Sequence, residues 1–317
     1  MKAFGLADEE ASAGVIDVPT PEPGPGEVRV RVRASSVNGF DVFVASGLAR
    51  TMMEHRYPVV GGKDFAGVVD RVGEGVTRFA AGDEVVGITP PGMVVSSVGG
   101  YAEHVVVPED GFLEPKPANL DFERAASVGL AALTAQVAVD VIKASEGDVV
   151  LIVGATGGVG VYTVQLAARA GATVLATSLP EDEAWIKGLG ANEAFDYSSE
   201  IVPVVRERYP DGVDALIVAV QLGDAFGPTA ELVKDGGRLA SIVGGADAES
   251  VAARGVTGTD VFGQSDPEAF RRVLRLSAEG ALEVPVTRTF AFDDLPEALG
   301  LAGERRSRGK LAVTISG

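Results

Sequence analysis

Alternating apolar and polar residues fill the first third of the chain. Residues 26–37 (GEVRVRVRASSV) alternate valine with arginine, as expected of a strand that buries one face and exposes the other. Residues 99–108 (GGYAEHVVVP) and the glycine-bounded segments AGVVDRVGEGV and GDEVVGI are further short strands of this kind. Several short strands at such close spacing predict an antiparallel β-barrel or sandwich.

The pattern changes near residue 119. Residues 119–144 are rich in alanine and predict a helix, residues 148–154 (DVVLIVG) predict a buried strand, and strands then alternate with helices. Such alternation is typical of a parallel sheet with helices on both faces. An amphipathic helix at 266–280 and a closing strand (RGKLAVTISG) follow, and we expect them to return to the first domain.

The charge balance excludes two classes of partner. Acidic residues outnumber basic ones by 45 to 27, which gives a formal net charge of −18. A chain this acidic repels nucleic-acid phosphates and anionic lipids, so neither nucleic acid nor a membrane is an expected partner. The N-terminal segment MKAFGLADEE lacks the apolar stretch of a signal peptide, and no apolar run of about twenty residues is evident. We therefore expect a cytoplasmic protein.

The chain has no cysteine and only two histidines, His55 and His104. Disulfides, thiolate nucleophiles and cysteine-bound zinc are thereby excluded. The histidines do not have the spacing of a zinc-binding HExxH motif, and each is interpreted as a packing or surface residue. We expect no metal site.

The strongest functional signal is a glycine loop between a predicted strand and a predicted helix, in VVLIVGATGGVGVYTVQLAARAG. Glycines at this point let the backbone turn tightly and approach a pyrophosphate, whose charge is bound by free N–H groups at the start of the helix. The loop therefore predicts a dinucleotide site. Its expected contacts are Gly154, Ala155, Thr156, Gly157, Gly158, Val159 and Gly160.

The end of the next predicted strand bears on the choice of cofactor. NAD sites place an acidic residue there to bind the ribose 2′-hydroxyl, whereas this chain has Thr177 and Ser178. Neutral hydroxyls tolerate a 2′-phosphate, so NADPH is favoured over NADH, although three acidic residues at 181–183 follow directly. Val220 and Gly244, at the ends of two later strand segments, complete the expected cofactor contacts.

The order of motifs resembles the medium-chain dehydrogenase/reductase superfamily, and more closely its zinc-free quinone oxidoreductase branch. Nearly the whole chain takes part in this resemblance, which rests on collinear order rather than on any one motif. The matching segments are VNGFDVFVASG, GGKDFAGVVDRVGEGVTRFAAGDEVVG, GGYAEHVVVP, AASVGLAALTA, GATGGVG, LGANEAFDY and GKLAV.

The resemblance implies a fold and a division into domains. The implied class is α/β, with a Rossmann doubly wound parallel sheet inserted in a GroES-like β-barrel domain. Residues 1–118 and 263–317 would form the GroES-like catalytic domain, and residues 119–262 the NAD(P)-binding domain. A homodimer is expected through the segments GRLASIVG and 256–264.

The resemblance also implies roles for individual residues. Asn38 matches the active-site asparagine of the family, on the nicotinamide side, and Asp41 matches its usual acid, which could relay a proton. Thr134 would lie near the nicotinamide or pyrophosphate, and Tyr197 near the adenosine 2′-phosphate.

The zinc-dependent members of the superfamily bind zinc through a cysteine and a histidine. Asn38 stands at the cysteine position of this chain and Lys63 at the histidine position, which agrees with the absence of cysteine. Asp64, beside Lys63, is expected to bind backbone or basic groups rather than to carry a proton-transfer step.

The implied function is a zinc-independent, NADPH-dependent oxidoreductase that transfers a hydride to a quinone or an α,β-unsaturated carbonyl compound. A 2-enoyl thioester reductase is an alternative, although the segment VFVASGLAR lacks the proton-donating tyrosine of those enzymes. A low-turnover NADPH-binding scaffold or redox sensor is an alternative of another class.

Overall fold

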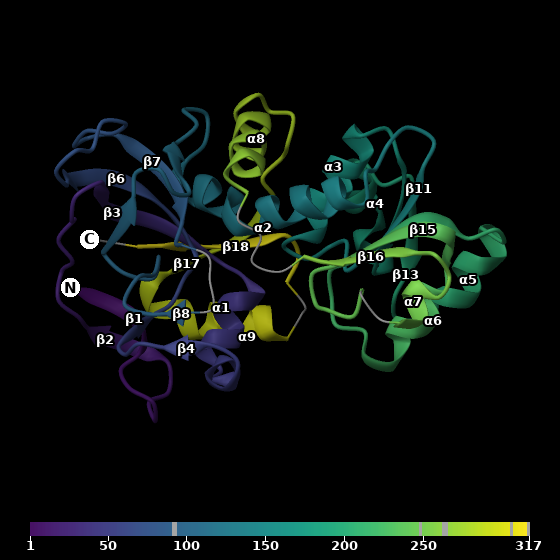
Figure 1. The fold of residues 1–317 in the computed structure, drawn as a ribbon, viewed down its shortest axis with the longest axis horizontal. Coiled ribbons are helices and arrows are strands. Elements are labelled where there is room, and N and C mark those ends of the chain that lie inside the picture. Colours follow the sequence, from purple (N-terminus) through teal and green to yellow (C-terminus); the bar gives the residue numbers. More distant parts are fainter. Residues whose placement is uncertain (91–93, 247–248, 262–265, 305–306, 316–317) are drawn as a thin grey trace. The chain divides into compact units, whose positions relative to one another are not determined.

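The computed structural model describes residues 1–90, 94–246, 249–261, 266–304 and 307–315. It divides into two compact units (Figure 1). Unit 1 consists of Met1–Ala131 and Ser265–Gly317, and unit 2 of Ala132–Gln264. Residues 119–131, which were predicted to belong to the cofactor domain, thus lie in unit 1.

Unit 1 is a β-structure, as the alternating pattern predicts. Its described residues form a seven-stranded sheet in the order β10-β7-β6-β3-β18-β17, with β9 also paired to β3. Neighbours are antiparallel except β17 and β18, which are parallel. The strands are β3 (Glu27–Val37), β6 (Asp64–Val72), β7 (Glu84–Ile88), β9 (His104–Pro108), β10 (Leu113–Pro115), β17 (Val286–Ala291) and β18 (Lys310–Thr314).

Smaller elements complete unit 1. A second sheet has the order β2-β1-β5, and β4 pairs with β8. These strands are β1 (Lys2–Leu6), β2 (Gly14–Asp17), β4 (Glu54–His55), β5 (Val59–Val60) and β8 (Val94–Val95). The helical segments are α1 (Gly39–Ala45), η1 (Leu48–Thr51), α8 (Pro267–Ala278), η4 (Phe292–Asp294) and α9 (Leu295–Gly303).

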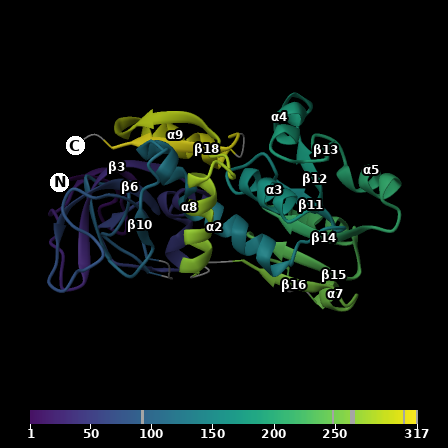
Figure 2. The same ribbon diagram turned by 90° about the horizontal axis from the view of Figure 1, so that it is seen from above.

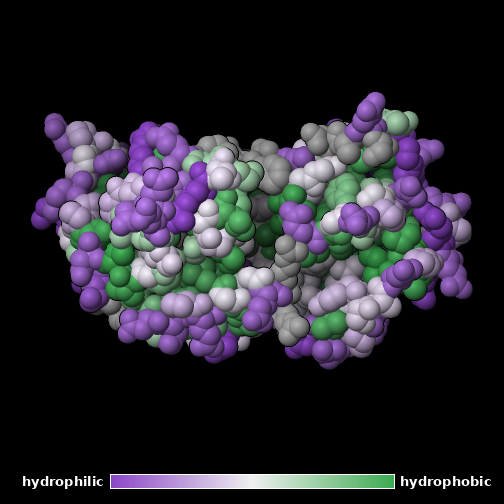
Figure 3. Space-filling model, turned by 90° about the horizontal axis from the view of Figure 1, so that it is seen from below, coloured by the Kyte–Doolittle hydropathy of each residue, from purple (hydrophilic) through white to green (hydrophobic). Residues whose placement is uncertain are grey.

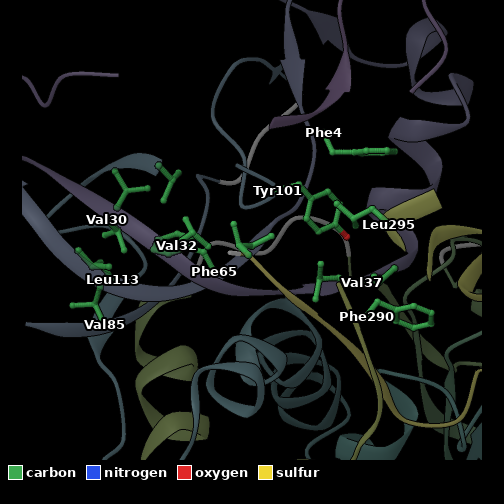
Figure 4. Close-up of a cluster of buried hydrophobic side chains, with 14 of the residues drawn as sticks. Phe4, Val30, Val32, Val37, Phe65, Val85, Tyr101, Leu113, Phe290 and Leu295 are labelled. Carbon is green, nitrogen blue, oxygen red and sulfur yellow. The ribbon is translucent and has the colours of Figure 1, made fainter. Parts of the chain in front are cut away.

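The core of unit 1 joins segments that are far apart in the sequence. Val30 and Val32 on β3 are fully buried and share one cluster with Phe65 and Tyr101 (Figure 4). Phe290, from the C-terminal segment, belongs to the same cluster. Burial of such apolar side chains is the main favourable term in folding, so the two separated parts of the chain form one domain.

One arginine of β3 departs from the predicted alternation. Arg29 is only 8% exposed although the pattern placed it on a charged outer face. Its guanidinium donates two hydrogen bonds to Asp70, at 2.9 and 3.0 Å, and a third to Glu22 at 2.9 Å. Paired and hydrogen-bonded charge can be buried, which explains the departure.

Unit 2 contains the predicted doubly wound sheet. Among its described residues six parallel strands have the order β13-β12-β11-β14-β15-β16, the arrangement of a Rossmann fold, and Figure 2 shows this succession. The fold class is therefore confirmed. The strands are β11 (Val149–Val153), β12 (Thr173–Ser178), β13 (Glu193–Asp196), β14 (Val213–Val218), β15 (Val233–Ser241) and β16 (Thr257–Asp260).

Short helical segments connect these strands. They are α3 (Gly160–Arg169), η2 (Pro180–Asp182), α4 (Glu183–Gly188), α5 (Ile201–Arg208), η3 (Gly223–Ala225), α6 (Phe226–Ala230) and α7 (Glu249–Ala252). The segment GRLASIVG, which the dimer expectation placed at the sixth strand, belongs mainly to β15, and β16 is the sixth strand. Residues 262–264 of the expected dimer segment lie outside the described residues.

Helix α2 (Phe122–Val141) begins in unit 1 and ends in unit 2. By length and composition this helix could cross a membrane, which corrects the expectation that the chain has no apolar run of about twenty residues. However, 72% of the relevant window is buried, as in the core helix of a soluble protein. Hydrophilic side chains make up much of the face drawn in Figure 3, as expected for a chain with 23% charged residues.

Candidate active site and cofactor loop

The glycine loop of unit 2 connects the end of β11 to the start of α3. Gly154 has φ +85°, a conformation that L side chains rarely adopt. A Cβ on Gly160 would lie 2.1 Å from the carbonyl oxygen of Gly154, so helix and strand can approach only because this residue is glycine. A Cβ on Gly157 would meet only that oxygen, at 3.4 Å, and otherwise open space. A tightly packed base with an open rim fits a dinucleotide pyrophosphate.

Two of the predicted cofactor residues lie against the first glycine of the loop. The amide of Gly154 donates to Thr177 Oγ1 at 3.0 Å, and Thr177 is buried. The side chain of Val220 lies 3.1 Å from the position of a Cβ on Gly154. The hydroxyl of Thr177 therefore holds the loop in place.

Ser178 and Tyr197, the residues expected at the ribose, lie at and directly after the ends of the neighbouring strands β12 and β13. The amide of Tyr197 donates to the carbonyl of Ser178 at 3.3 Å, so these two residues are neighbours. Ser178 is buried and Tyr197 is 46% exposed. Of the acidic residues at 181–183, Asp182 is buried and the other two are exposed.

The two remaining residues that were predicted to contact the cofactor are Gly244 and Thr134. Gly244 has φ +94°, and its carbonyl accepts a hydrogen bond from Ser241 Oγ at 2.9 Å. Thr134 is half-buried in the second half of α2, within unit 2.

Asn38 and Asp41, the predicted catalytic pair, lie together at the start of α1. The amide of Asn38 donates to Asp41 Oδ2 at 2.9 Å, and its side-chain Nδ2 reaches the same oxygen at 3.3 Å. Asn38 Nδ2 also donates to Asp64 Oδ2 at 2.8 Å, while Oδ1 accepts from Lys310 Nζ at 2.7 Å. The side chain of Asn38 is thus held at both ends.

Asp64 is the centre of this buried network. It is fully buried and accepts hydrogen bonds from Ser36 Oγ at 2.6 Å, from Asn38 and from the backbone amide of Leu130 at 2.7 Å. Lys310 Nζ, also buried, lies 3.9 Å from Asp64 Oδ2 and donates to the carbonyl of Val37 at 3.1 Å. The charge of Asp64 is therefore balanced by a cation and by several donors, as burial requires.

The contact of Asp64 with Leu130 coincides with an interruption of helix α2. Gly129 has the non-helical angles φ −15° and ψ −119°. A Cβ on Gly129 would lie 2.1 Å from Asp64 Oδ1, so no other residue fits here. The carboxylate thereby satisfies an N–H group that the interruption frees from the helix.

Asp41 has a second set of partners. Its Oδ1 accepts from the amide of Lys63 at 3.1 Å, and its Oδ2 accepts from the hydroxyl of Tyr101 at 3.3 Å. Burial, reinforced by the nearby charge of Asp64, raises the pKa of Asp41 to about 6. Burial also raises the pKa of Tyr101 well above its usual value, so this phenol stays protonated.

The raised pKa of Asp41 predicts a pH-dependent stability. Below about pH 4 the carboxyl of Asp41 is protonated in both the folded and the unfolded state, so the folded protein carries no cost of burying its charge. As the pH rises through 6, the folded state must ionise a group that the unfolded chain has already ionised, and stability falls by on the order of 3 kcal/mol. Urea unfolding between pH 4 and 7 should show this fall, relative to Asp41→Asn. Parallel curves for the two proteins would contradict it.

Comparisons with known proteins agree with this arrangement. Residues 24–118 match the alcohol dehydrogenase GroES-like domain, and residues 189–313 match the zinc-binding dehydrogenase domain. A solved NAD-dependent alcohol dehydrogenase is 33% identical, with a TM-score of 0.86 and full coverage of both chains. The chain belongs to the medium-chain dehydrogenase/reductase superfamily.

Members of this superfamily with quinone- and enone-reducing names are among the relatives. The quinone oxidoreductase of Coxiella burnetii is 29% identical, with a TM-score of 0.86 and coverage of 100% of this chain and 99% of that one. The NADPH-dependent alkenal/one oxidoreductase of Arabidopsis thaliana is 34% identical over 191 residues, which are 59% of this chain and 47% of that protein. The matches span about half the length of such curated relatives.

The superfamily includes zinc enzymes, but the residues of this chain do not fit a zinc site. Asn38 has both ends of its amide bound to protein groups, and Lys63 offers an ammonium group instead of an imidazole. Within the described residues, no three His, Cys, Asp or Glu side chains are grouped so that they could hold a metal. No step of the reaction is therefore assigned to zinc.

Sequence reasoning missed several members of the network. Lys310, Tyr101 and Leu130 were not assigned to the site, although each lies in a quoted motif. Lys310 opens the apolar strand KLAVT, and a lysine that begins so buried a strand was the available signal. Tyr101 and Leu130 gave no signal, because a tertiary contact alone brings them to the carboxylates.

Proposed function

We propose that the protein is an oxidoreductase that transfers a hydride from NADPH to a quinone or an α,β-unsaturated carbonyl compound. The observation that carries the proposal is the glycine loop between β11 and α3, with its closely packed base and open rim. Membership in a superfamily that includes quinone and alkenal oxidoreductases supports the choice of acceptor. A bound NADPH would supply the hydride.

The roles of the chain's own residues follow from their positions. Residues 154–160 would bind the pyrophosphate, with Thr177 fixing the first amide of the loop. Ser178 and Tyr197 would lie at the ribose, where the absence of an acid at position 178 supports NADPH over NADH. Asn38 and Thr134 would orient the nicotinamide, and Asp41 would take part in proton relay.

The test is consumption of NADPH, and separately of NADH, with a panel of quinones, enones and enoyl thioesters. Reduction of quinones or enones with NADPH as the better donor is the expected result. Preference for enoyl thioesters would favour a 2-enoyl thioester reductase. Tight binding of NADPH without turnover of any acceptor would indicate a scaffold or redox sensor and would refute the proposed activity.

Replacing Gly157 with alanine should separate cofactor binding from folding. The added Cβ meets only one protein atom within 4 Å, at 3.4 Å, so the melting temperature should stay within about 2 °C of the wild type. The methyl group would occupy space at the rim that the pyrophosphate needs. We expect the Kd of NADPH, measured by its fluorescence, to rise about tenfold. An unchanged Kd would place the pyrophosphate elsewhere.

Three further features belong to this proposal. The enzyme would work without zinc, so dialysis against a chelator should leave its rate unchanged. It would form a homodimer through β16, the edge strand of the parallel sheet in the described residues, which sedimentation velocity can measure. It would act in the cytoplasm on a small-molecule acceptor, without nucleic acid or membrane partners.

A further inference from the structure

Lys63 is a half-buried cation with few protein partners. Its ammonium group donates to the carbonyl of Pro90 at 2.9 Å and lies 5.0 Å from the centre of the Phe40 ring. An ammonium group has three N–H donors, and within the described residues only this one bond uses them. No carboxylate of the described residues lies within ion-pair distance of it.

The other deeply placed lysines of unit 1 differ in this respect. Lys310 has Asp64 at 3.9 Å and two hydrogen bonds to oxygen atoms. Lys116 has Glu84 at 3.1 Å and bonds to two carbonyl groups. Since a desolvated charge without a counter-ion is costly, the unpaired state of Lys63 needs an explanation. A ligand oxygen with negative charge would supply one.

The neighbours of Lys63 contain a second unsatisfied group. Thr89 is 2% exposed, and its hydroxyl has no hydrogen-bond partner within the described residues. The amide of Thr89 donates to the carbonyl of Lys63 at 2.7 Å, which keeps the two residues adjacent. Buried hydroxyls are normally paired, so the hydroxyl of Thr89 is a second polar group beside Lys63 whose hydrogen-bonding capacity the described residues do not fill.

The surroundings of Lys63 change the pKa of its ammonium group. Burial lowers the pKa of Lys63, and the charges of Asp41 and Asp64 oppose the shift without cancelling it. Those two carboxylates are already bound by Tyr101 and Lys310. A lysine in this state gives up its proton more readily near neutral pH than an exposed one.

We propose that Lys63 binds the carbonyl oxygen of the acceptor and protonates it. The inference rests on the proposed function. Hydride adds to the β-carbon of an enone, the electron pair of the C=C bond moves to give an enolate, and the enolate oxygen takes a proton as one N–H bond of Lys63 breaks. The neutral amine then recovers a proton from water. In this role the ammonium group is the electrophile of a site without zinc.

The first test needs neither cofactor nor turnover. The probe is 4-nitrophenol, whose yellow phenolate resembles an enolate oxygen, titrated into the cofactor-free protein. We expect the wild type to bind the phenolate form and to lower the apparent pKa of the probe. Lys63→Met should weaken this binding about tenfold or more, Lys63→Arg should retain it, and Lys2→Met, an exposed control with the same charge change, should leave it unchanged.

Two results of that titration would overturn the inference. One is equal binding of the phenolate by wild type and Lys63→Met. The other is no binding by the wild type at all. Melting temperatures of all variants show whether they are folded. If Lys63→Met does not fold, Lys63→Arg is the variant that is compared with the wild type.

The second test uses the turnover reaction. With an enone, Lys63→Met should reduce kcat about 100-fold while the Kd of NADPH stays unchanged. The alkaline limb of the wild-type pH profile should move upward in Lys63→Arg and disappear in Lys63→Met. An unchanged profile in both variants would refute the role. If the wild type reduces no acceptor, the proposed function fails, and the nitrophenol titration still decides whether Lys63 binds an oxyanion.

Discussion

Asp64→Ala is expected to lower the free energy of unfolding by about 3–5 kcal/mol. The change removes the carboxylate beside the buried ammonium group of Lys310 and leaves Asp41 as the remaining carboxylate that acts on that charge. It also removes the hydrogen bonds that Asp64 accepts from the amide of Leu130 and from the hydroxyl of Ser36. Urea unfolding at pH 7 measures the loss. A change below about 1 kcal/mol would show that the network contributes little.

Two companion variants identify the cause. Asp64→Asn keeps the size of the side chain but removes its charge, so it should destabilise the fold and disturb cofactor positioning. The double variant Asp64→Ala with Lys310→Met should recover part of the lost stability, because neither charge of the pair remains buried. A normal melting temperature of Asp64→Asn combined with the loss of a pH-dependent rate would instead assign a proton-transfer role to Asp64.

Gly160→Ala is expected to damage the cofactor loop severely. The new Cβ would lie 2.1 Å from the Gly154 oxygen and 2.6 Å from backbone atoms of Ala155, and backbone atoms cannot move aside cheaply. We expect the Kd of NADPH to rise about 100-fold and the free energy of unfolding to fall by about 1–3 kcal/mol. Fluorescence titration and urea unfolding measure the two effects.

Gly227→Ala is the matched control in the same unit. Gly227 is an exposed residue of α6, and the methyl group of an alanine would meet no heavy atom within 4 Å beyond its own helix and chain neighbours. The same chemical change should therefore be tolerated there. Wild-type affinity in Gly160→Ala would contradict the role of the loop. Loss of affinity in both variants would point to a general effect of replacing glycine.

Most of the fold could be predicted because it depends on local periodicity. The alternation in residues 26–37 predicts β3, and the buried run before Gly154 predicts β11. The strand order of unit 2 follows from the family resemblance together with the rules for parallel sheets. The burial of Arg29 was missed, because its partner Asp70 lies on another strand.

The candidate site was predictable only in part. Asn38 and Asp41 are three residues apart, and local capping geometry brings them together. The hydrogen bonds of Asn38 to Asp64 and Lys310 depend on strand pairing across the sheet, and the Asp64 carboxylate also lies against the interruption at Gly129. Such contacts have no local signature, so the network had to come from the structure.

The position of Lys310 in the chain has a consequence for synthesis. Asn38 and Asp64 precede unit 2 in the chain, whereas Lys310, the cation that they contact, follows it and is synthesised later. Domains generally fold as units during synthesis, but unit 1 cannot complete its buried network until Lys310 has been synthesised, because until then Asp64 lacks its counter-ion. The nascent chain therefore completes unit 2 before unit 1, although unit 1 is begun first.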